Sequence, residues 1–273
     1  MQPSKQAYKI DLHSHSVMSH DGIMVESDYK KLFDSGKLDY LAITDHNEIE
    51  YAQKMQKVFG ERIIVGEEIS VTLADTIQAY EVESISDQIQ DWELRHHDAK
   101  INRMAQNGRL YDLIGLFLTK KIEKGTPIRK AIRQIHEQGG LVYIPHPGDP
   151  MRGGIPFPIL ELPEIYTEVD MYEEFNARYI WPFGNRRVAK FVSYFGGYPL
   201  VAGSDAHAPS ELGRTYNVIY EKPNADNLSD LLIDAEDDPR NQRHYVHPWQ
   251  YLNPKINKVR KAIMKDMPSP TEH

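Results

Sequence analysis

Side chains that bind metal ions are concentrated near the start of the chain. The segment DLHSHSVMSHDG, residues 11–22, holds three histidines and two aspartates in twelve positions. Alternate residues of an extended chain point the same way, so His13 and His15 are placed to reach one ion. A lone His-x-His pair also occurs on ordinary surfaces and in cores, so this pair by itself indicates little.

Further residues of the same kind follow other short apolar runs. His46 comes after LAIT, Glu68 after IIVG, His146 after VYIP, and Asp205 with His207 after LVAGS. The chain has no cysteine, so any metal site is built from nitrogen and oxygen donors. Histidines with several carboxylates suit Zn²⁺, Mn²⁺ or Fe²⁺, and carboxylates can bridge two ions about 3.5–4 Å apart. Because such ions activate water and clamp phosphate oxygens, the set predicts phosphoester hydrolysis.

Short apolar runs alternate with helical patterns along most of the chain. The runs are YKIDLH, LDYLAIT, RIIVGEEIS, DLIGLFL, LVYIP and PLVAGSDAH, and helices are expected over residues 26–36, 48–59, 128–138 and 186–195. These strands are too apolar to leave one face in water, which predicts a parallel sheet covered by helices. Since the metal-binding residues follow successive strand ends, we expect an α/β barrel that gathers them at its C-terminal face.

Two segments depart from this alternation. Residues 75–110 have the pattern of one long helix, which we expect as an insertion over the barrel mouth. As a lid, this helix would form a positive rim for an anionic substrate, and the alternative is an ordinary solvated helix face. Its basic residues are Arg95, His96, His97, Lys100, Arg103 and Arg109. Residues 221–273 form a C-terminal extension with expected helices at 228–235 and 257–264. The whole chain, 1–273, is expected to be a single domain.

The composition is that of an ordinary globular protein. Of 273 residues, 40% are hydrophobic and 26% charged, and no apolar stretch is long enough to cross a membrane. The first residues do not resemble a secretory signal, so a cytoplasmic location is expected. The formal net charge of −8 disfavours broad binding of nucleic acid, although a local basic strip remains possible.

The motifs resemble those of the PHP (polymerase and histidinol phosphatase) phosphoesterases. The resemblance rests on DLHSHSVMSHDG, LAITDHNE, VGEEIS, GLFLTKKIEKG, EQGGLVYIPHPGDPMRGG, YEEFNAR and VAGSDAHAPSELGRTY, which occur in this order between residues 9 and 216. It implies a distorted (β/α)₇ barrel, similar to a TIM barrel. It also implies hydrolysis of phosphate esters with up to three metal ions at the C-terminal face.

Carried over to matching positions, the resemblance implies three ion sites. The first ion would be held by His13, His15, Glu68 and Asp205; the second by Glu68 and His146; and the third by Asp21, His46 and His207. Spacing favours Asp21 over its neighbour His20 as the third-ion ligand. The expected cofactors are two or three divalent ions per chain, Mn²⁺, Zn²⁺ or Fe²⁺, with Mg²⁺ as an alternative.

One ligand of the resembling family is missing. Many members supply a further histidine to the second ion from a segment written roughly Val-His-Leu-Leu-Gly. The equivalent here is either TIQAY, with Gln78 at the histidine position, or DLIGLFL, with Ile114 there, and we prefer DLIGLFL. Neither residue is an imidazole, so the second ion is expected to be weakly held or absent, unless His96 or His97 replaces the ligand.

Four residues are expected to carry catalysis: Asp21, Glu68, His207 and Arg152. The guanidinium of Arg152 is suited to bind a phosphate, but a salt bridge to Asp149 is an equal alternative. Glu173 and Asn176 are expected to orient ligands instead of binding an ion.

The leading hypothesis is a metal-dependent hydrolase that attacks a small phosphorylated molecule, a phosphomonoester or nucleotide, with a metal-bound hydroxide. Three alternatives remain: a nuclease with the same chemistry, a catalytically weakened metal-binding or regulatory domain, and a carbon–nitrogen hydrolase of the amidohydrolase kind. The sequence leaves the substrate's identity and the oligomeric state open.

Overall fold

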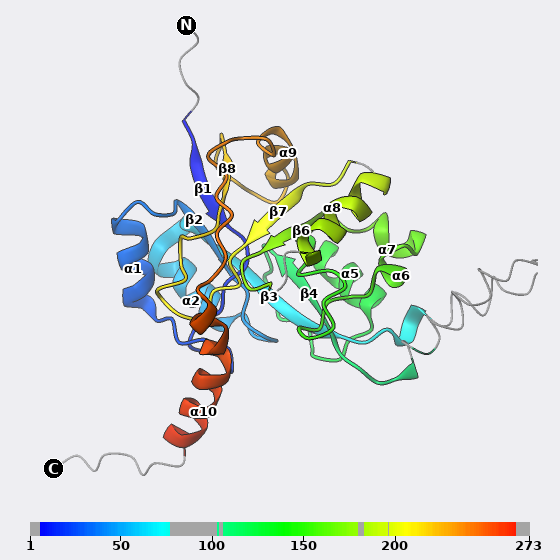
Figure 1. Cartoon of the computed structure of the whole chain (residues 1–273), viewed down its shortest axis with the longest axis horizontal. Helices are drawn as coiled ribbons and strands as arrows, with labels where there is room; N and C mark the ends of the chain where they lie inside the picture. The colour runs from blue at the N-terminus through cyan, green and yellow to red at the C-terminus, as the bar shows by residue number, and fades with distance from the viewer. Residues whose placement is uncertain (1–5, 77–102, 104–105, 180–182, 196, 266–273) are drawn as a thin grey trace, which may run out of the picture.

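Eight strands form one sheet in the computed structural model, which describes residues 6–76, 103, 106–179, 183–195 and 197–265 (Figure 1). In space the strands follow the order β7-β6-β5-β4-β3-β2-β1-β8. Their bounds are β1 Tyr8–Asp11, β2 Tyr40–Ile43, β3 Ile63–Val71, β4 Tyr111–Leu116, β5 Leu141–Ile144, β6 Met171–Asn176, β7 Leu200–Gly203 and β8 Asn217–Ile219. The strands that carry the expected ligands are therefore neighbours in a single sheet.

The helices connect the strands and cover the sheet. They are α1 Glu26–Asp34, α2 Glu50–Phe59, η1 Gly60–Arg62, α5 Ile128–His136, α6 Phe157–Leu160, α7 Pro163–Tyr166, α8 Phe183–Phe195, α9 Leu228–Asp234, η2 Pro248–Leu252 and α10 Asn253–Lys265. The six predicted helices in the described part of the chain are present, with ends shifted by a few residues. In Figure 1, α9 lies near the start of β1, and α10 lies beyond its opposite end.

Most neighbouring strands run parallel, but strands β4 and β8 run antiparallel to their neighbours. β4 is antiparallel to both β3 and β5, and β8 is antiparallel to β1. The prediction of an all-parallel sheet is therefore wrong at these two strands. The physical reason at β4 is its register: its first residue, Tyr111, pairs with the last residue of β3, Val71, so the chain re-enters the sheet at the end it has just left.

The sheet curves into a nearly closed barrel, which confirms the predicted barrel architecture. At the mouth, an isolated parallel bridge joins Ser14, after β1, to Ala206, after β7. Lower down, the side chain of Asn217 on β8 takes the place of a strand partner for β7. Its amide accepts a hydrogen bond from the Ala202 backbone N at 2.9 Å and donates one to the Ala202 carbonyl at 2.8 Å.

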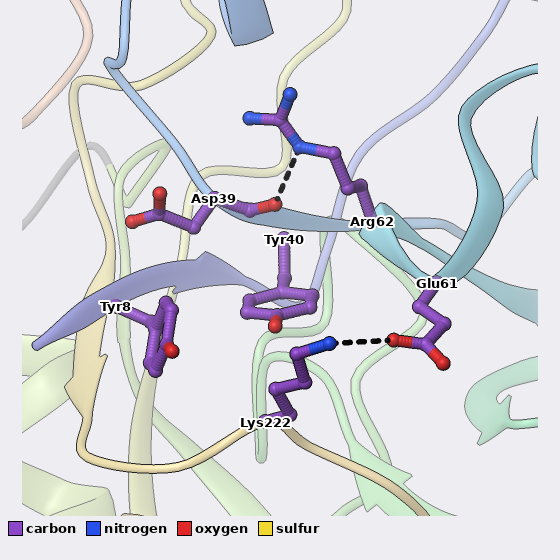
Figure 2. A pocket seen from close by; sticks show the side chains of 6 residues that line it. All are labelled: Tyr8, Asp39, Tyr40, Glu61, Arg62 and Lys222. Carbon is purple, nitrogen blue, oxygen red and sulfur yellow. Dashed lines mark hydrogen bonds and ion pairs between the residues drawn. The ribbon is translucent and has the colours of Figure 1, made fainter. Parts of the chain in front are cut away.

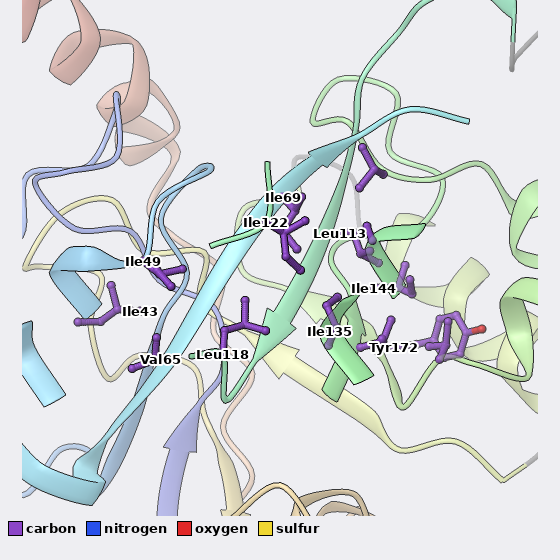
Figure 3. Packing of buried hydrophobic residues seen from close by; sticks show 14 of the residues in the cluster. Ile43, Ile49, Val65, Ile69, Leu113, Leu118, Ile122, Ile135, Ile144 and Tyr172 are labelled. Carbon is purple, nitrogen blue, oxygen red and sulfur yellow. The ribbon is translucent and has the colours of Figure 1, made fainter. Parts of the chain in front are cut away.

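Apolar side chains fill both faces of the sheet. One cluster packs the strands against the helices and includes Ile43, Val65, Leu113 and Ile135 (Figure 3). Residues that alternate with these along the same strands, such as Ala42, Ile64 and Ile114, form a second cluster with α9. Because successive side chains of a strand point to opposite faces, the second cluster marks the inner face of the barrel.

The expected insertion at residues 75–110 lies mostly outside the described residues, and so do Gln78, Arg95, His96, His97 and Lys100. Its helical structure and its role at the mouth therefore stay predictions, as does the single-domain organisation. Among the helices that the structure describes, none has the length and apolar character needed to cross a membrane.

Candidate metal centre

The four residues expected at the first ion converge at the barrel mouth. His13 and His15 follow β1, with their Nε2 atoms 3.2 Å apart. The Nε2 of His15 lies 3.3 Å from Glu68 Oε2 and 3.3 Å from Asp205 Oδ1, and that of His13 lies 3.7 Å from each carboxylate. All four side chains are buried. They are spaced so that one cation can contact two imidazoles and two carboxylates.

A second convergence brings together the residues expected at the third ion. Oδ2 of Asp21 lies 3.3 Å from His207 Nε2 and 3.7 Å from His46 Nε2. These three residues and His15 form one group whose donor atoms all lie within 4.8 Å of one another. The neighbouring His20 is half-exposed and is not in this group. The position of Asp21 agrees with the choice made from spacing, but its role as a ligand stays a prediction.

Around Glu68 the structure contains a residue that sequence reasoning missed. His146 Nε2 lies 3.0 Å from Glu68 Oε1, as expected for a second-ion pair. Ile114, placed at the missing histidine position, instead belongs to the inner apolar cluster. Asp112, two residues earlier on β4, forms a group with Glu68 and His46 whose donor atoms lie within 4.8 Å of one another.

The assignment of Ile114 to the histidine position is therefore corrected. In the pattern Val-His-Leu-Leu-Gly the histidine stands three residues before the glycine, and counting back from Gly115 leads to Asp112. Strand direction also hid this residue. We expected ligands at the C-terminal ends of strands, whereas antiparallel β4 presents its N-terminal end to the mouth.

Hydrogen bonds determine which nitrogen several imidazoles present to the cluster. Nδ1 of His13 donates to Glu173 Oε1 at 2.9 Å, and Nδ1 of His207 donates to the Asp205 carbonyl at 2.7 Å. With Nδ1 engaged in these bonds, Nε2 is the nitrogen that points toward the neighbouring carboxylates, and it offers a lone pair to an ion once it is deprotonated. Both imidazoles are thus oriented to bind a metal ion through Nε2.

Burial and the neighbouring charges shift the pKa values of the clustered side chains in different directions. Burial, reinforced by His207 and His46, lowers the pKa of His15 to about 3, so His15 is neutral. Burial opposes protonation of His46 as well, but the carboxylates of Glu68 and Asp21 outweigh it and raise its pKa to about 10. Burial alone would raise the pKa of Glu68, yet the His46 and His13 charges hold it well below its usual range. Cation binding at His46 would therefore release a proton.

The donor set fits divalent cations. Oε2 of Glu68 and Nδ1 of His146 are buried and have no hydrogen-bond partner among the described residues. Buried polar atoms normally have partners, and a carboxylate oxygen without one beside further carboxylates is well suited to a cation. Nine imidazole and carboxylate side chains make up the overlapping groups: His13, His15, Asp21, His46, Glu68, Asp112, His146, Asp205 and His207. No soft sulfur donor is available in this cysteine-free chain.

Two glutamates near the cluster have non-ligand contacts. Glu173 is fully buried on β6, where Tyr143 Oη donates to Oε1 at 2.8 Å and Asn176 Nδ2 donates to Oε2 at 2.8 Å. Together with its bond to His13, these contacts agree with the expected orienting role. Glu67, on the opposite face of β3 from Glu68, accepts a hydrogen bond from the Ile122 backbone N at 2.8 Å.

Arg152 lies at the edge of the cluster and contacts several acceptors. Its Nη1 donates to Asp205 Oδ2 at 3.1 Å and to Asn176 Oδ1 at 2.5 Å, and its Nε lies 3.6 Å from Asp149 Oδ2. The guanidinium also packs over the Tyr179 ring, 5.3 Å from its centroid. The alternative salt bridge to Asp149 is therefore present, together with a shorter contact to a metal-ligand candidate.

A separate groove lies away from this chemistry. Its lining residues are Tyr8, Asp39, Tyr40, Glu61, Arg62 and Lys222 (Figure 2). They stand at or just before the starts of β1, β2 and β3 or after β8, whereas the cluster follows the opposite strand ends. Arg62 Nε donates to the backbone carbonyl of Asp39, and Lys222 Nζ forms an ion pair with Glu61 at 3.4 Å. This groove contributes nothing to the metal centre.

Comparison with known proteins identifies related sequences. A family model described as PHP-associated matches residues 182–235. Two uncharacterized proteins of Methanocaldococcus jannaschii are similar in sequence. MJ0417 is 31% identical over 144 residues, 52% of this chain and 54% of that protein, and MJ1587 is 27% identical over 182 residues, 62% of this chain and 82% of that protein. The chain thus spans about half the length of MJ0417.

Solved structures share the fold. A two-domain protein from Bacteroides vulgatus, containing a predicted PHP-like metal-dependent phosphoesterase, superposes with a TM-score of 0.51 at 17% identity, covering 93% of this chain and 70% of that one. PsfC from Pseudomonas syringae superposes with a TM-score of 0.54 at 12% identity, covering 94% and 99% of the two chains. The nearly closed barrel is therefore an architecture found in PHP-like proteins.

The family match falls on the segment that includes β7 and the candidate ligands Asp205 and His207. The shared barrel extends over nearly the whole chain. The match over residues 182–235 and the sequence motifs make the chain similar to PHP proteins, and the barrel is a fold that it shares with a PHP-like protein.

Proposed function

We propose that this protein hydrolyses phosphoric ester bonds of a small phosphorylated molecule, with divalent metal ions bound at the barrel mouth. One observation carries the proposal: among the described residues, nine nitrogen- and oxygen-donor side chains form four overlapping groups that share His13, His15, His46 and Glu68. Groups that share donors in this way suit ions close enough to act on one phosphate. The substrate, the number of ions and their identity are part of the proposal.

When bound, divalent ions in such a centre lower the pKa of a water ligand and neutralise charge on phosphate oxygens. The chain's own residues prepare for this. Glu173 and the Asp205 carbonyl accept hydrogen bonds from Nδ1 of His13 and His207, which leaves the Nε2 atoms facing inward toward an ion. Burial of Glu68 and Asp205 strengthens their interaction with a cation because water is excluded from the site.

Arg152 is the described cation best placed to bind the phosphoryl group. Its Nη1 contacts Asp205 at 3.1 Å, so a phosphate held beside Asp205 lies within reach of the guanidinium. A guanidinium can donate two parallel hydrogen bonds to phosphate oxygens. We assign Arg152 to phosphate binding. We assign Asp21, Glu68 and His207 to binding the metal ions that act in the reaction.

The accessible part of the cluster is small, which favours a compact substrate. Seven of the nine side chains belong to buried residues, and only His46 and Asp112 are half-buried. A terminal phosphate can enter such a site more readily than the middle of a strand. The net charge of −8 also disfavours a long polyanion.

The substrate class is tested by assaying mononucleotides, sugar phosphates and 5′-phosphorylated oligonucleotides side by side with Mn²⁺-loaded protein, using Asp205→Asn as the inactive control. We expect inorganic phosphate from the small esters and little shortening of the oligonucleotides. Oligonucleotide shortening with no release from small esters would instead identify a nuclease. Phosphate release that is equal in the Asp205→Asn variant would contradict the assigned site.

A further inference from the structure

We propose that Asp112 is a ligand of the ion held by Glu68 and His146, and that its carboxylate narrows the advantage of Zn²⁺ over Mn²⁺ at this site. The inference rests on the metal centre of the proposed function but on no particular substrate. It reverses the expectation that the second ion is weakly held for want of a histidine.

The backbone places Asp112 at the correct end of the barrel. Asp112 is the second residue of β4 and pairs in register with Ser70, near the end of β3. Ile114, two residues later and thus on the same face, pairs with Glu68 and lies in the inner cluster. The side chain of Asp112 therefore points to the inner face one step closer to the mouth than Ile114.

The loop that carries His146 packs against Asp112 and leaves room for its carboxylate. The Asp112 backbone N donates to the Gly153 carbonyl at 2.8 Å. A Cβ on Gly153 would lie 2.2 Å from Asp112 Oδ2, and Gly153 adopts a φ of 74°. Only glycine meets both conditions without strain. The same loop thus delivers His146 and accommodates the Asp112 carboxylate.

The polar atoms around this position lack partners that a cation would provide. Oε2 of Glu68 and Nδ1 of His146 are buried without hydrogen bonds from described residues, although His46 Nδ1 lies 3.1 Å from this Glu68 oxygen as an ion pair. The carboxylate of Asp112 lies in one group with Glu68 and His46, whose donor atoms are within 4.8 Å of one another, and no described residue donates a hydrogen bond to it. Two neighbouring carboxylates repel each other, and a divalent cation between them removes this repulsion more fully than the single charge of His46.

The exchange of imidazole for carboxylate has a chemical consequence. As joint ligands of one ion, Glu68, Asp112 and His146 would offer two carboxylates and one imidazole, whereas a histidine at residue 112 would give two imidazoles and one carboxylate. Zn²⁺ binds more tightly than Mn²⁺ to most nitrogen and oxygen sites, but hard oxygen donors reduce that difference. Asp112 therefore makes the site more suitable for Mn²⁺ than a histidine would.

The test is a calorimetric titration of metal-free protein with Mn²⁺ and, separately, with Zn²⁺. The variants are Asp112→Asn, Asp112→His and the control Glu123→Gln, which removes an exposed charge after β4. We expect Asp112→Asn to lose one Mn²⁺-binding event, or to weaken it at least about tenfold. Asp112→His should retain the event but raise the ratio of Zn²⁺ to Mn²⁺ affinity at least about tenfold.

Each alternative outcome has a distinct meaning. Wild-type isotherms from Asp112→Asn would overturn the assignment of Asp112 as a ligand while leaving the metal centre intact. An unchanged affinity ratio in Asp112→His would overturn the metal-preference part. Failure of the wild-type protein to bind any ion would overturn the proposed metal centre itself. Thermal unfolding of the metal-free variants, expected to match that of Glu123→Gln, shows that lost binding is not lost folding.

Discussion

Nδ1 of His13 lies 2.9 Å from Oε1 of Glu173, and both side chains are fully buried. This contact joins His13, just after β1, to Glu173 on β6, and it determines which imidazole nitrogen faces the cluster. The space for Glu173 depends on Gly203, since a Cβ there would lie 2.0 Å from Glu173 Oε1. Three strands thus cooperate to orient one imidazole.

Replacing Glu173 by glutamine should weaken ion binding without unfolding the protein. The amide cannot supply the negative charge that holds the proton on His13 Nδ1, and loss of such a partner typically costs 10–100-fold in metal affinity. Calorimetric titration with Mn²⁺ measures the effect. The matched control is Glu174→Gln on the same strand, because that carboxylate faces Arg243 at 3.5 Å instead of the cluster. Equal affinities in the two variants would refute the orienting role.

Helix α10 should support the ion site that contains Asp21. Asn257 Nδ2 donates to the carbonyls of Asp21, at 2.8 Å, and His207, at 3.3 Å. Removing a buried hydrogen-bonding group costs about 1–3 kcal/mol. We expect Asn257→Ala to lower the free energy of unfolding by this amount and to weaken one ion-binding event selectively. Lys255→Ala, an exposed change on the same helix, should do neither, and identical isotherms for both variants would contradict the prediction.

Arg152 should contribute to substrate binding. A hydrogen bond to a charged group contributes about 1.5–3 kcal/mol, so Arg152→Ala is expected to reduce kcat/KM by about 10–150-fold and to weaken inhibition by inorganic phosphate. Steady-state kinetics with the best small phosphoester measure both effects. The control is Arg133→Ala, an exposed arginine on α5. Unchanged inhibition by phosphate in Arg152→Ala would show that the arginine only braces Asp205.

A histidine remote from the mouth should make stability depend on pH. A hydrogen bond from His136 Nε2 to Asp170 at 3.3 Å raises the pKa of His136 above its ordinary value of 6.5. Since the raised pKa belongs to the folded state, the stabilisation is fully present below pH 6.5 and is lost as pH rises through the folded-state pKa. Denaturant unfolding of wild type and His136→Gln should therefore differ more at pH 5.5 than at pH 9. A difference that is constant across this range would exclude the ion pair as its cause.

Much of the site was predictable because its residues stand beside strand-forming sequence. His46, Glu68 and Asp205 each follow an apolar run, and parallel strands bring such positions to one face. Their convergence required only that the runs form neighbouring strands. The ligand role of each residue stays a prediction, but their proximity follows from a local pattern that the sequence displays.

Asp112 could not be found by the same rule because the direction of β4 depends on where the chain re-enters the sheet. No local pattern reveals that Tyr111 pairs with Val71. The contacts of α10 were hidden for a similar reason: Asn257 reaches Asp21 across 236 positions of sequence. Side-chain amides such as Asn217, which completes the pairing of β7, likewise have no signature along the chain.

The central claim is that the clustered side chains at the barrel mouth hold divalent ions, and elemental analysis of dialysed protein tests it most directly. Protein equilibrated with Mn²⁺ and then freed of unbound ions should retain two or three ions per chain, and Asp205→Asn should retain fewer. Folded wild-type protein that retains no ion after equilibration with Mn²⁺, Zn²⁺ or Fe²⁺ would contradict the account.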